Sequence, residues 1–190
     1  MRILPLEGAE SYEPVTVQEA REHLRVVDTA EDALIGRCIA AARRWCESFQ
    51  GRAWVERTLR LRLERFPKGA IALPYPPLKS VAAIRYTRQD GTEVTLPADA
   101  YRVLTGEPAK VLPVNGWPSE ALAPGLPVSI EYRSGTGANE AQVAALLLVL
   151  GALYENRQDE VTESVPRPVQ MGARALLWPQ RRYYEGPDAP

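Results

Sequence analysis

The sequence predicts an α+β fold, in which a helical bundle formed by the N- and C-terminal segments carries an inserted antiparallel β-rich block. Segments with helical spacing of apolar residues lie toward both ends of the chain, over about residues 30–49 and 140–156. Between them, apolar residues alternate with charged ones. We therefore expect residues 1–51 and 138–190 to form a helical core with a C-terminal tail, and residues 52–137 to form a β-rich subdomain.

Composition narrows the class of protein. The chain has 190 residues, of which 45% are hydrophobic and 25% charged, and its net charge is -1, as in ordinary globular proteins. Its longest apolar run, Val143–Leu153, is shorter than the about 20 residues that a membrane-spanning helix needs. No signal-peptide pattern opens the sequence, which favours an intracellular protein.

The two cysteines do not predict a covalent or metal site. Cys38 and Cys46 lie about 12 Å apart along one predicted helix, which is too far for a disulfide. His23 is the single histidine, so the residues that a structural zinc site needs are missing.

A short helix is predicted near the N-terminus, after an irregular, acidic segment at residues 1–15. Thr16 begins this helix as its N-cap, and Glu19 completes a capping box. The helical spacing of apolar residues continues to about Arg25.

A second, longer helix is predicted over about residues 30–49. We expect Asp28 or Thr29 to cap its N-terminus, where the side-chain oxygen would accept a backbone hydrogen bond. Gly51 stands where a left-handed residue would end the helix.

Strands are predicted after Gly51, because the period of the apolar residues changes from helical to alternating. Asp90-Gly91 is typical of the turn of a β-hairpin. Prolines and glycines are frequent over residues 106–127, so we expect that segment to be mostly loop. The candidate strands are residues 59–63, 70–73, 81–87, 93–96, 101–104 and 128–132.

The C-terminal part is again helical by its pattern. Asn139 is expected to cap a helix over about residues 140–156, whose run Leu146–Leu150 is apolar on every side. Such a run is buried either inside the domain, which we favour, or partly against another subunit. A short helix is predicted over residues 169–178, ended by Pro179. A tail beyond it cannot bury its own aromatic residues and needs a partner surface.

The sequence contains no set of residues typical of catalysis, and no catalytic, cofactor-binding or metal-binding residue is predicted. His23 has no pairing group nearby, which favours a solvated side chain over a general base. Ser134–Gly137 precedes a helix as a phosphate loop does, but no Lys-Ser/Thr follows and Glu140 would repel phosphate there.

Charge is unevenly distributed along the chain. Residues 1–32 carry 3 basic and 8 acidic groups, whereas residues 33–80 carry 10 and 3. Subunits that meet head to tail in a ring would use such polarity, and independently solvated faces explain it equally well. Nucleic-acid contact by an arginine-rich strand is a weaker alternative to a charged outer strand face, because glutamates interrupt the arginines and no aromatic platform lies alongside. The arginines concerned are Arg57, Arg60, Arg62 and Arg65.

Many short motifs, in one order and spacing, resemble a known family: the head-to-tail connector (adaptor, head-completion) proteins of long-tailed double-stranded DNA bacteriophages, prophages and gene transfer agents. The resemblance covers about residues 15–184, and residues 1–14 have no clear counterpart in it. The motifs are Thr16–Ala20, His23–Val26, Asp32–Ile35, Ile39–Arg43, Glu47–Arg52, Leu73-Pro74, Pro76–Val81, Tyr86, Asp90-Gly91, Tyr101–Val103, Trp117-Pro118, Val128–Tyr132, Gly135, Gly137, Tyr154–Arg157, Ala175–Pro179, Arg181 and Arg182.

The resemblance implies a non-enzymatic virion protein of the head–tail neck, assembled in the bacterial host cytoplasm and without a membrane partner. It would form a ring, commonly of twelve copies, beneath the portal protein, join the DNA-filled head to a stopper or tail-completion protein, and continue the DNA channel. The lumen is expected to be acidic or mixed in charge, so that double-stranded DNA slides through it. The alternative is a tail-side neck or tail-completion (stopper or terminator) protein.

The resemblance also implies where the portal would bind. In related connectors the C-terminal segment docks on the portal, which agrees with the aromatic residues left without a core in the tail. The expected portal-binding residues are Leu176, Leu177, Trp178, Arg181, Arg182, Tyr183 and Tyr184.

Overall fold

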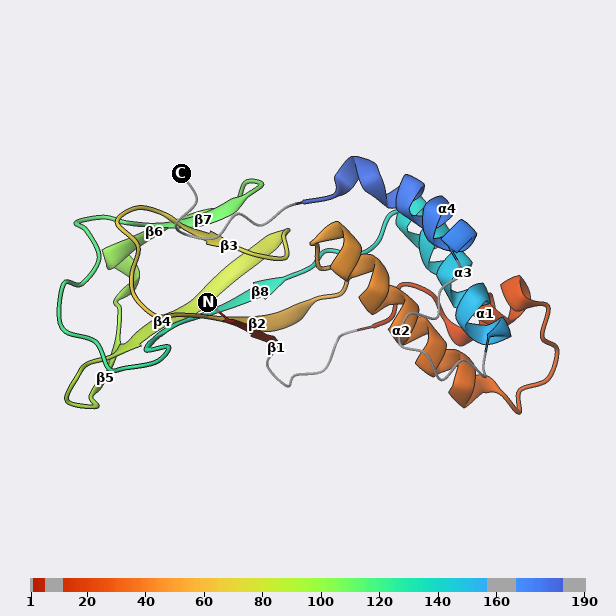
Figure 1. The fold of residues 1–190 in the computed structure, drawn as a ribbon, viewed down its shortest axis with the longest axis horizontal. Coiled ribbons are helices and arrows are strands. Elements are labelled where there is room, and N and C mark those ends of the chain that lie inside the picture. Colours follow the sequence, from red (N-terminus) through yellow and green to blue (C-terminus); the bar gives the residue numbers. More distant parts are fainter. Residues whose placement is uncertain (1, 6–11, 157–166, 183–190) are drawn as a thin grey trace. The chain divides into compact units, whose positions relative to one another are not determined.

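The computed structural model describes residues 2–5, 12–156 and 167–182, and the chain divides into two compact units (Figure 1). Among the described residues, the sheet unit contains residues 2–5 and 56–136. The helical unit contains residues 12–55, 137–156 and 167–182. The α+β class predicted from the sequence is confirmed.

The helical unit has four helices around one apolar core, in which α3 contacts each of the other three. Thr16 and Glu19 form the predicted capping box, and Asn139 accepts a hydrogen bond from the backbone N–H of Gln142, as a cap does. Gly51 ends its helix in the left-handed conformation, with a φ of 65°. The bounds are α1 Val17–Leu24, α2 Asp32–Gln50, α3 Glu140–Glu155 and α4 Arg167–Leu177, followed by the 3₁₀ helix η2 Trp178–Gln180.

The predicted cap of α2 is wrong. Glu31 is the N-cap residue and makes no side-chain capping bond, although α2 begins close to the predicted residue. Asp28 accepts a hydrogen bond from the backbone N–H of Ala30 at 2.9 Å instead. An aspartate that bonds to the backbone two residues further on forms a local turn, and this turn precedes the helix.

The apolar run of α3 is mostly buried inside the helical unit. Leu146, Val149 and Leu150 are fully buried, whereas Leu148 is 41% exposed. Leu148 lies beside Gly172 of α4, at the surface. Burial within the domain therefore covers most of the run, as the favoured interpretation predicts.

The sheet unit consists of two antiparallel sheets. The five-stranded sheet has the order β1-β2-β8-β4-β5, and the three-stranded sheet has the order β3-β7-β6. In register, Leu61 of β2 is opposite Ile130 of β8, which is opposite Ile84 of β4. The bounds are β1 Arg2–Pro5, β2 Arg57–Leu63, β3 Ile71–Leu73, β4 Leu78–Thr87, β5 Glu93–Thr95, β6 Tyr101–Leu104, β7 Ala109–Pro113 and β8 Val128–Ser134, with a 3₁₀ turn η1 at Ala98–Ala100.

The core of the sheet unit lies between its two sheets (Figure 1). Leu59, Leu61 and Leu63 of β2 point into it, together with Ile71 of β3 and Val111 of β7. The charged residues that alternate with the leucines of β2 therefore point away from the core.

Two strands were not predicted. Residues 2–5 form β1 at the edge of the five-stranded sheet, although residues 1–15 are expected to be irregular. Residues 109–113 form β7, the central strand of the smaller sheet, inside a segment expected to be loop. Pro113 stands at the end of β7, where a proline interrupts few ladder hydrogen bonds, so the proline-rich composition did not prevent a strand.

The hairpin turn is confirmed. Asp90 accepts a hydrogen bond from the backbone N–H of Thr92 at 2.8 Å, and Gly91 has a φ of 88°. This hydrogen bond lowers the pKa of the Asp90 carboxyl. The turn joins β4 to β5 as the sequence predicts.

Candidate functional site

The candidate site is the segment that follows α4, together with the C-terminal end of α2 to which it is attached. Gln50, the last residue of α2, makes the attachment. Its backbone carbonyl accepts a hydrogen bond from the N–H of Arg182 at 2.7 Å. Its side-chain Nε2 donates to the carbonyl of Leu177 at 3.0 Å. The segment between Leu177 and Arg182 is thus held at both ends by one residue.

The side chain of Gln50 is itself held by hydrogen bonds from two further side chains. Its Oε1 accepts hydrogen bonds from Nε1 of Trp54 at 2.8 Å and from Nε2 of Gln142 at 2.7 Å. Gln50, Trp54 and Gln142 are all buried. Buried polar groups that are fully hydrogen-bonded specify one arrangement of the surrounding chain. The network therefore gives residues 177–182 a defined path.

Gly51 lets the segment come close to α2. A Cβ placed on Gly51 would lie 2.4 Å from the carbonyl oxygen of Arg182, where no real Cβ fits. The φ of 65° independently favours glycine at this position. Gly51 thus serves both the helix end and the close approach of the C-terminal segment.

Aromatic rings and guanidinium groups cover the outside of this attachment. Trp45 and Phe49 stack one turn apart on α2, with ring centroids 6.0 Å apart. The guanidinium of Arg181 lies 4.5 Å from the ring centre of Phe49 and 5.3 Å from that of Trp178. Arg174 of α4 lies 5.4 Å from the ring centre of Phe49. Cation–π contacts of this kind stabilise a surface arrangement by about 0.5–1 kcal/mol each.

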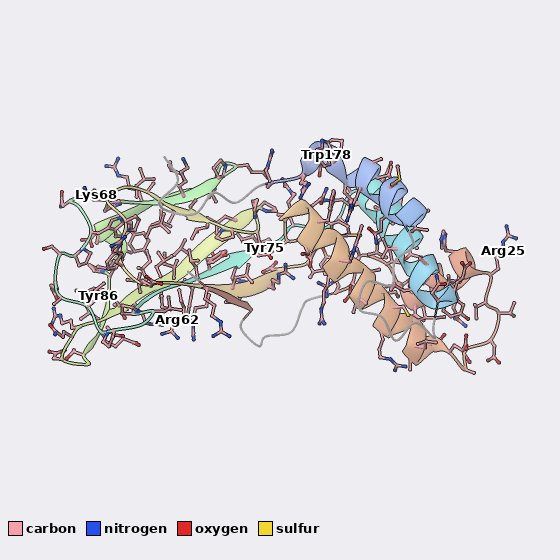
Figure 2. The ribbon with its side chains drawn as sticks, in the orientation of Figure 1. Arg25, Arg62, Lys68, Tyr75, Tyr86 and Trp178 are labelled. Atoms are coloured by element: carbon pink, nitrogen blue, oxygen red, sulfur yellow. The ribbon has the colours of Figure 1, made fainter. Side chains whose placement is uncertain are left out.

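The seven predicted portal-binding residues differ in how far they are exposed. Leu177 is fully buried in the core of the helical unit, so it does not belong to the surface. Leu176 and Trp178 are 39% and 59% exposed, Arg181 is half-buried and Arg182 is exposed. Figure 2 labels Trp178 in the segment that follows α4. Tyr183 and Tyr184 lie outside the described residues.

Several residues at the site were not identified from the sequence pattern. Phe49 and Trp45 have core-like helical spacing, yet both are only half-buried and carry the arginines on their faces. Gln50 contacts residues that are far away in the sequence, so no local pattern could have identified it. Met171 of α4 is 72% exposed, although it is a large apolar residue.

A buried ion pair lies deeper in the helical unit. Arg43 is fully buried and donates to Glu47 at 2.9 Å and to Glu13 at 2.7 Å. Glu47 also accepts a hydrogen bond from the backbone N–H of Trp54 at 2.6 Å. The carboxylates are engaged by a guanidinium that keeps its charge, so the cluster suits a structural role and not proton transfer.

The other residues that could take part in catalysis or metal binding do not lie together in one site. His23 is exposed on α1. Burial raises the pKa of the Cys46 thiol to about 12, with a smaller contribution from the charge of Glu47, so this thiol is not a nucleophile. Over residues 2–5, 12–156 and 167–182, no cluster of three or more His, Cys, Asp or Glu residues could hold a metal ion. Within the same ranges, no helix is long and apolar enough to cross a membrane.

The four arginines considered for nucleic-acid contact point in different directions. Arg57 stacks over the ring of Tyr75, 5.5 Å from its centre, and Arg65 is exposed in the turn after β2. Arg60 pairs with Glu131, and Arg62 donates to the carbonyl of Leu126 at 2.8 Å. Only Arg60 and Arg62 therefore share the outward side of β2.

Comparison with known proteins gives a family match over part of the chain and a shared fold over nearly all of it. Residues 14–96 match the model of a family described as Phage gp6-like head-tail connector protein. No curated protein matches the chain in sequence.

Three solved chains of gene transfer agent (GTA) particles share the fold, each with 24% sequence identity. One belongs to the virion of the native GTA particle and has a TM-score of 0.76, covering 98% of this chain and 100% of that one. A second belongs to the neck of the empty GTA particle computed with C6 symmetry, with a TM-score of 0.75 and 97% of each chain covered. A third belongs to the neck of the native GTA particle computed with C12 symmetry, with a TM-score of 0.67 and 97% of each chain covered. Over residues 14–96 the chain is thus similar to the Phage gp6-like head-tail connector family, and over nearly its whole length it shares the fold of the GTA chains.

Proposed function

We propose that the protein is a structural component of the virion neck that joins the DNA-filled head to the tail. The observation that carries this proposal is the family match over residues 14–96, within a fold shared with chains of gene transfer agent particles. Its action is binding and not catalysis. The necks of the related particles were computed with C6 and C12 symmetry, which supports a ring of copies, and twelve copies around the channel is the arrangement we propose.

The docking surface for the portal protein lies on the last turn of α4 and the segment after it. Its described members are Leu176, Trp178, Arg181 and Arg182, and Leu177 is left out because it belongs to the core. A segment already held by Gln50 and Gly51 loses little conformational freedom when it binds, which favours affinity. In a ring, many modest contacts act together because the first one raises the effective concentration of the others.

The proposal is tested by mixing the purified protein with the portal ring from the same genome and recording native mass spectra. Uptake of one copy per portal subunit is expected. A complex that forms only with tail-side neck proteins would contradict portal docking and move the protein to the stopper or terminator position.

Trp178→Ala tests the docking surface itself. We expect it to weaken portal uptake at least tenfold, because loss of an anchoring aromatic at an interface costs about 2 kcal/mol or more. The thermal stability of the free protein should change little, since Trp178 is 59% exposed. Leu104→Ala is the matched control, because Leu104 is 50% exposed on the sheet unit. Equal effects of the two substitutions on uptake would refute the proposed surface.

A further inference from the structure

The side of the five-stranded sheet that faces away from the core carries an excess of positive charge. We call this side the arginine face. Its register places Arg60, Arg62, Glu131 and Arg85 on one side, because residues directly opposite each other in neighbouring strands share a face. Its charged members are Arg2, Arg60, Arg62, Lys79, Arg85 and Arg133, against Glu56, Glu93 and Glu131.

Two of the carboxylates are each shared between cations. Glu131 accepts from Arg60 and lies 3.0 Å from Nη1 of Arg85. Burial raises the pKa of Glu131, but hydrogen bonds and charges from these two arginines outweigh it and hold the pKa below its usual value. Glu56 pairs with Lys79 and Arg133. These pairs keep the cations at fixed positions without cancelling the net positive charge of the face.

One row across the sheet contains no carboxylate at all. Arg2 of β1 is opposite Arg62 of β2, which is opposite Ser129 of β8, which is opposite Arg85 of β4 and then Thr95 of β5. Like charges directly opposite in a sheet destabilise it. Among residues 2–5, 12–156 and 167–182, neither Arg2 nor Arg62 has a carboxylate partner. Arg2 and Arg62 therefore carry positive charge that no described carboxylate neutralises, whereas Arg85 is paired with Glu131.

Arg62 is held ready for an anion. Its Nε and Nη2 donate to the carbonyl of Leu126 at 3.1 and 2.8 Å, which fixes the plane of the guanidinium. The side chain points away from the core of the sheet unit (Figure 2). A guanidinium in a fixed plane offers its remaining N–H groups as a fork to an oxyanion such as phosphate.

We propose that the arginine face binds the phosphate backbone of double-stranded DNA, an inference that rests on the proposed function as part of a DNA channel. The described outward residues of the face are cations, carboxylates, hydroxyls such as Thr58 and Ser129, and the small Ala83. Arginine, lysine and hydroxyl side chains are among the groups that contact phosphates in protein–DNA complexes. No outward aromatic among the described residues could anchor a protein partner or stack on a base, so the contact is with the backbone and independent of sequence.

The contact is weak and depends on salt, because carboxylates share the face with the cations. Each phosphate neutralised adds about 0.9 to the slope of log affinity against log salt. Weak, salt-dependent contacts hold DNA near the protein without stopping its movement along the surface.

The experiment measures binding of a fluorescein-labelled 30-bp duplex by fluorescence anisotropy, from low salt to 200 mM. Arg2→Gln with Arg62→Gln is compared with Arg37→Gln plus Arg44→Gln, which removes the same charge from exposed positions of α2. We expect the first pair to weaken binding at least fivefold and to lower the salt slope by about 2. The control pair should change affinity less than twofold.

Arg2→Gln alone keeps the test valid if the double variant folds poorly, because Arg2 is exposed and its side chain has no hydrogen-bond or ion-pair partner among the described residues. Equal losses in the two pairs, or no duplex binding by the unaltered protein at 50 mM salt, would overturn the inference. Portal uptake is measured on the same samples. If the protein joins the portal ring but binds no duplex, the proposed function stands and only DNA binding by the arginine face is refuted.

Discussion

The helical unit and the sheet unit place their polar groups in opposite ways. The helical unit buries Arg43, Glu47, Gln50 and Gln142, whereas Ser134 is the single buried polar side chain among the described residues of the sheet unit. The ion pairs of the sheet unit lie on its surface instead. A core with bonded polar groups accepts one geometry, and an apolar core tolerates many. The polar core of the helical unit therefore holds one segment of the chain in a defined position, whereas the sheet unit presents its charges on a face.

The buried network has a clear task in the helical unit. Through Glu47 and Arg43 it binds Glu13 and the backbone of Trp54, and through Gln50 it binds Leu177 and Arg182. These segments are not neighbours in sequence. The polar core thus ties together pieces of chain that apolar packing alone would leave free to slide.

Of the proposed substitutions, Glu47→Ala should lower the free energy of unfolding most. It leaves Arg43 buried with only Glu13 and removes the acceptor of the Trp54 N–H, so we expect a loss of about 3–5 kcal/mol. Urea unfolding followed by tryptophan fluorescence measures it. A Trp117→Phe background is used, because the other three of the four tryptophans belong to the helical unit.

Glu131→Ala is the matched substitution in the sheet unit. It removes a carboxylate shared by two arginines on the surface, and a loss within about 1 kcal/mol is expected. Circular dichroism in the β region follows this unit. If Glu47→Ala and Glu131→Ala lowered the free energy of unfolding equally, the contrast between a polar core and a polar surface would be wrong.

Gly51→Ala should have an intermediate effect. A left-handed φ costs a residue with a Cβ about 1–2 kcal/mol, and the clash with the Arg182 carbonyl adds to it. Trypsin should then cut faster after Arg181, because the segment is displaced. Gly36→Ala is the control, since a Cβ there meets nothing within 4 Å and α2 gains about 0.5–1 kcal/mol. Slow cleavage in both variants would mean that Gly51 does not hold the segment.

The last prediction concerns alkaline pH and has no effect on stability at neutral pH. The pKa of Cys46 is raised to about 12 in the folded protein, so above the ordinary thiol pKa the unfolded chain loses a proton that the folded chain keeps. Stability therefore falls as pH rises, by about 1.4 kcal/mol per pH unit between about 9 and 12. Subtracting the urea curves of Cys46→Ala isolates this slope from the titration of tyrosine and lysine. An unchanged slope in Cys46→Ala would show that Cys46 is not its source.

Local signals in the sequence predicted local structure well. The capping box at Thr16, the N-cap at Asn139 and the left-handed Gly51 depend on neighbours within a few residues, and the structure confirms them. Strand β7 was missed because prolines at its ends resemble those of a loop, and β1 because its strand character depends on pairing with β2.

The candidate site was predictable only in part. Exposure of Trp178 followed from the aromatic tail, but Leu177 beside it is buried, and a pattern cannot separate two such neighbours without the core. Gln50 is polar at the end of a helix and resembles a solvated residue in sequence. Its role depends on Gln142 and Leu177, which only the fold brings to it.

The attachment of residues 177–182 to α2 also determines which unit can fold first during synthesis on the ribosome. The sheet unit has its strands once residue 134 has emerged, so it can fold while synthesis continues. The helical unit lacks the acceptor of the Gln50 Nε2 group until Leu177 has emerged, so its buried hydrogen-bond network is completed only then. The segment that we assign to the portal is thus the one that completes the unit, and a nascent chain cannot offer a finished docking surface before its helical unit is whole.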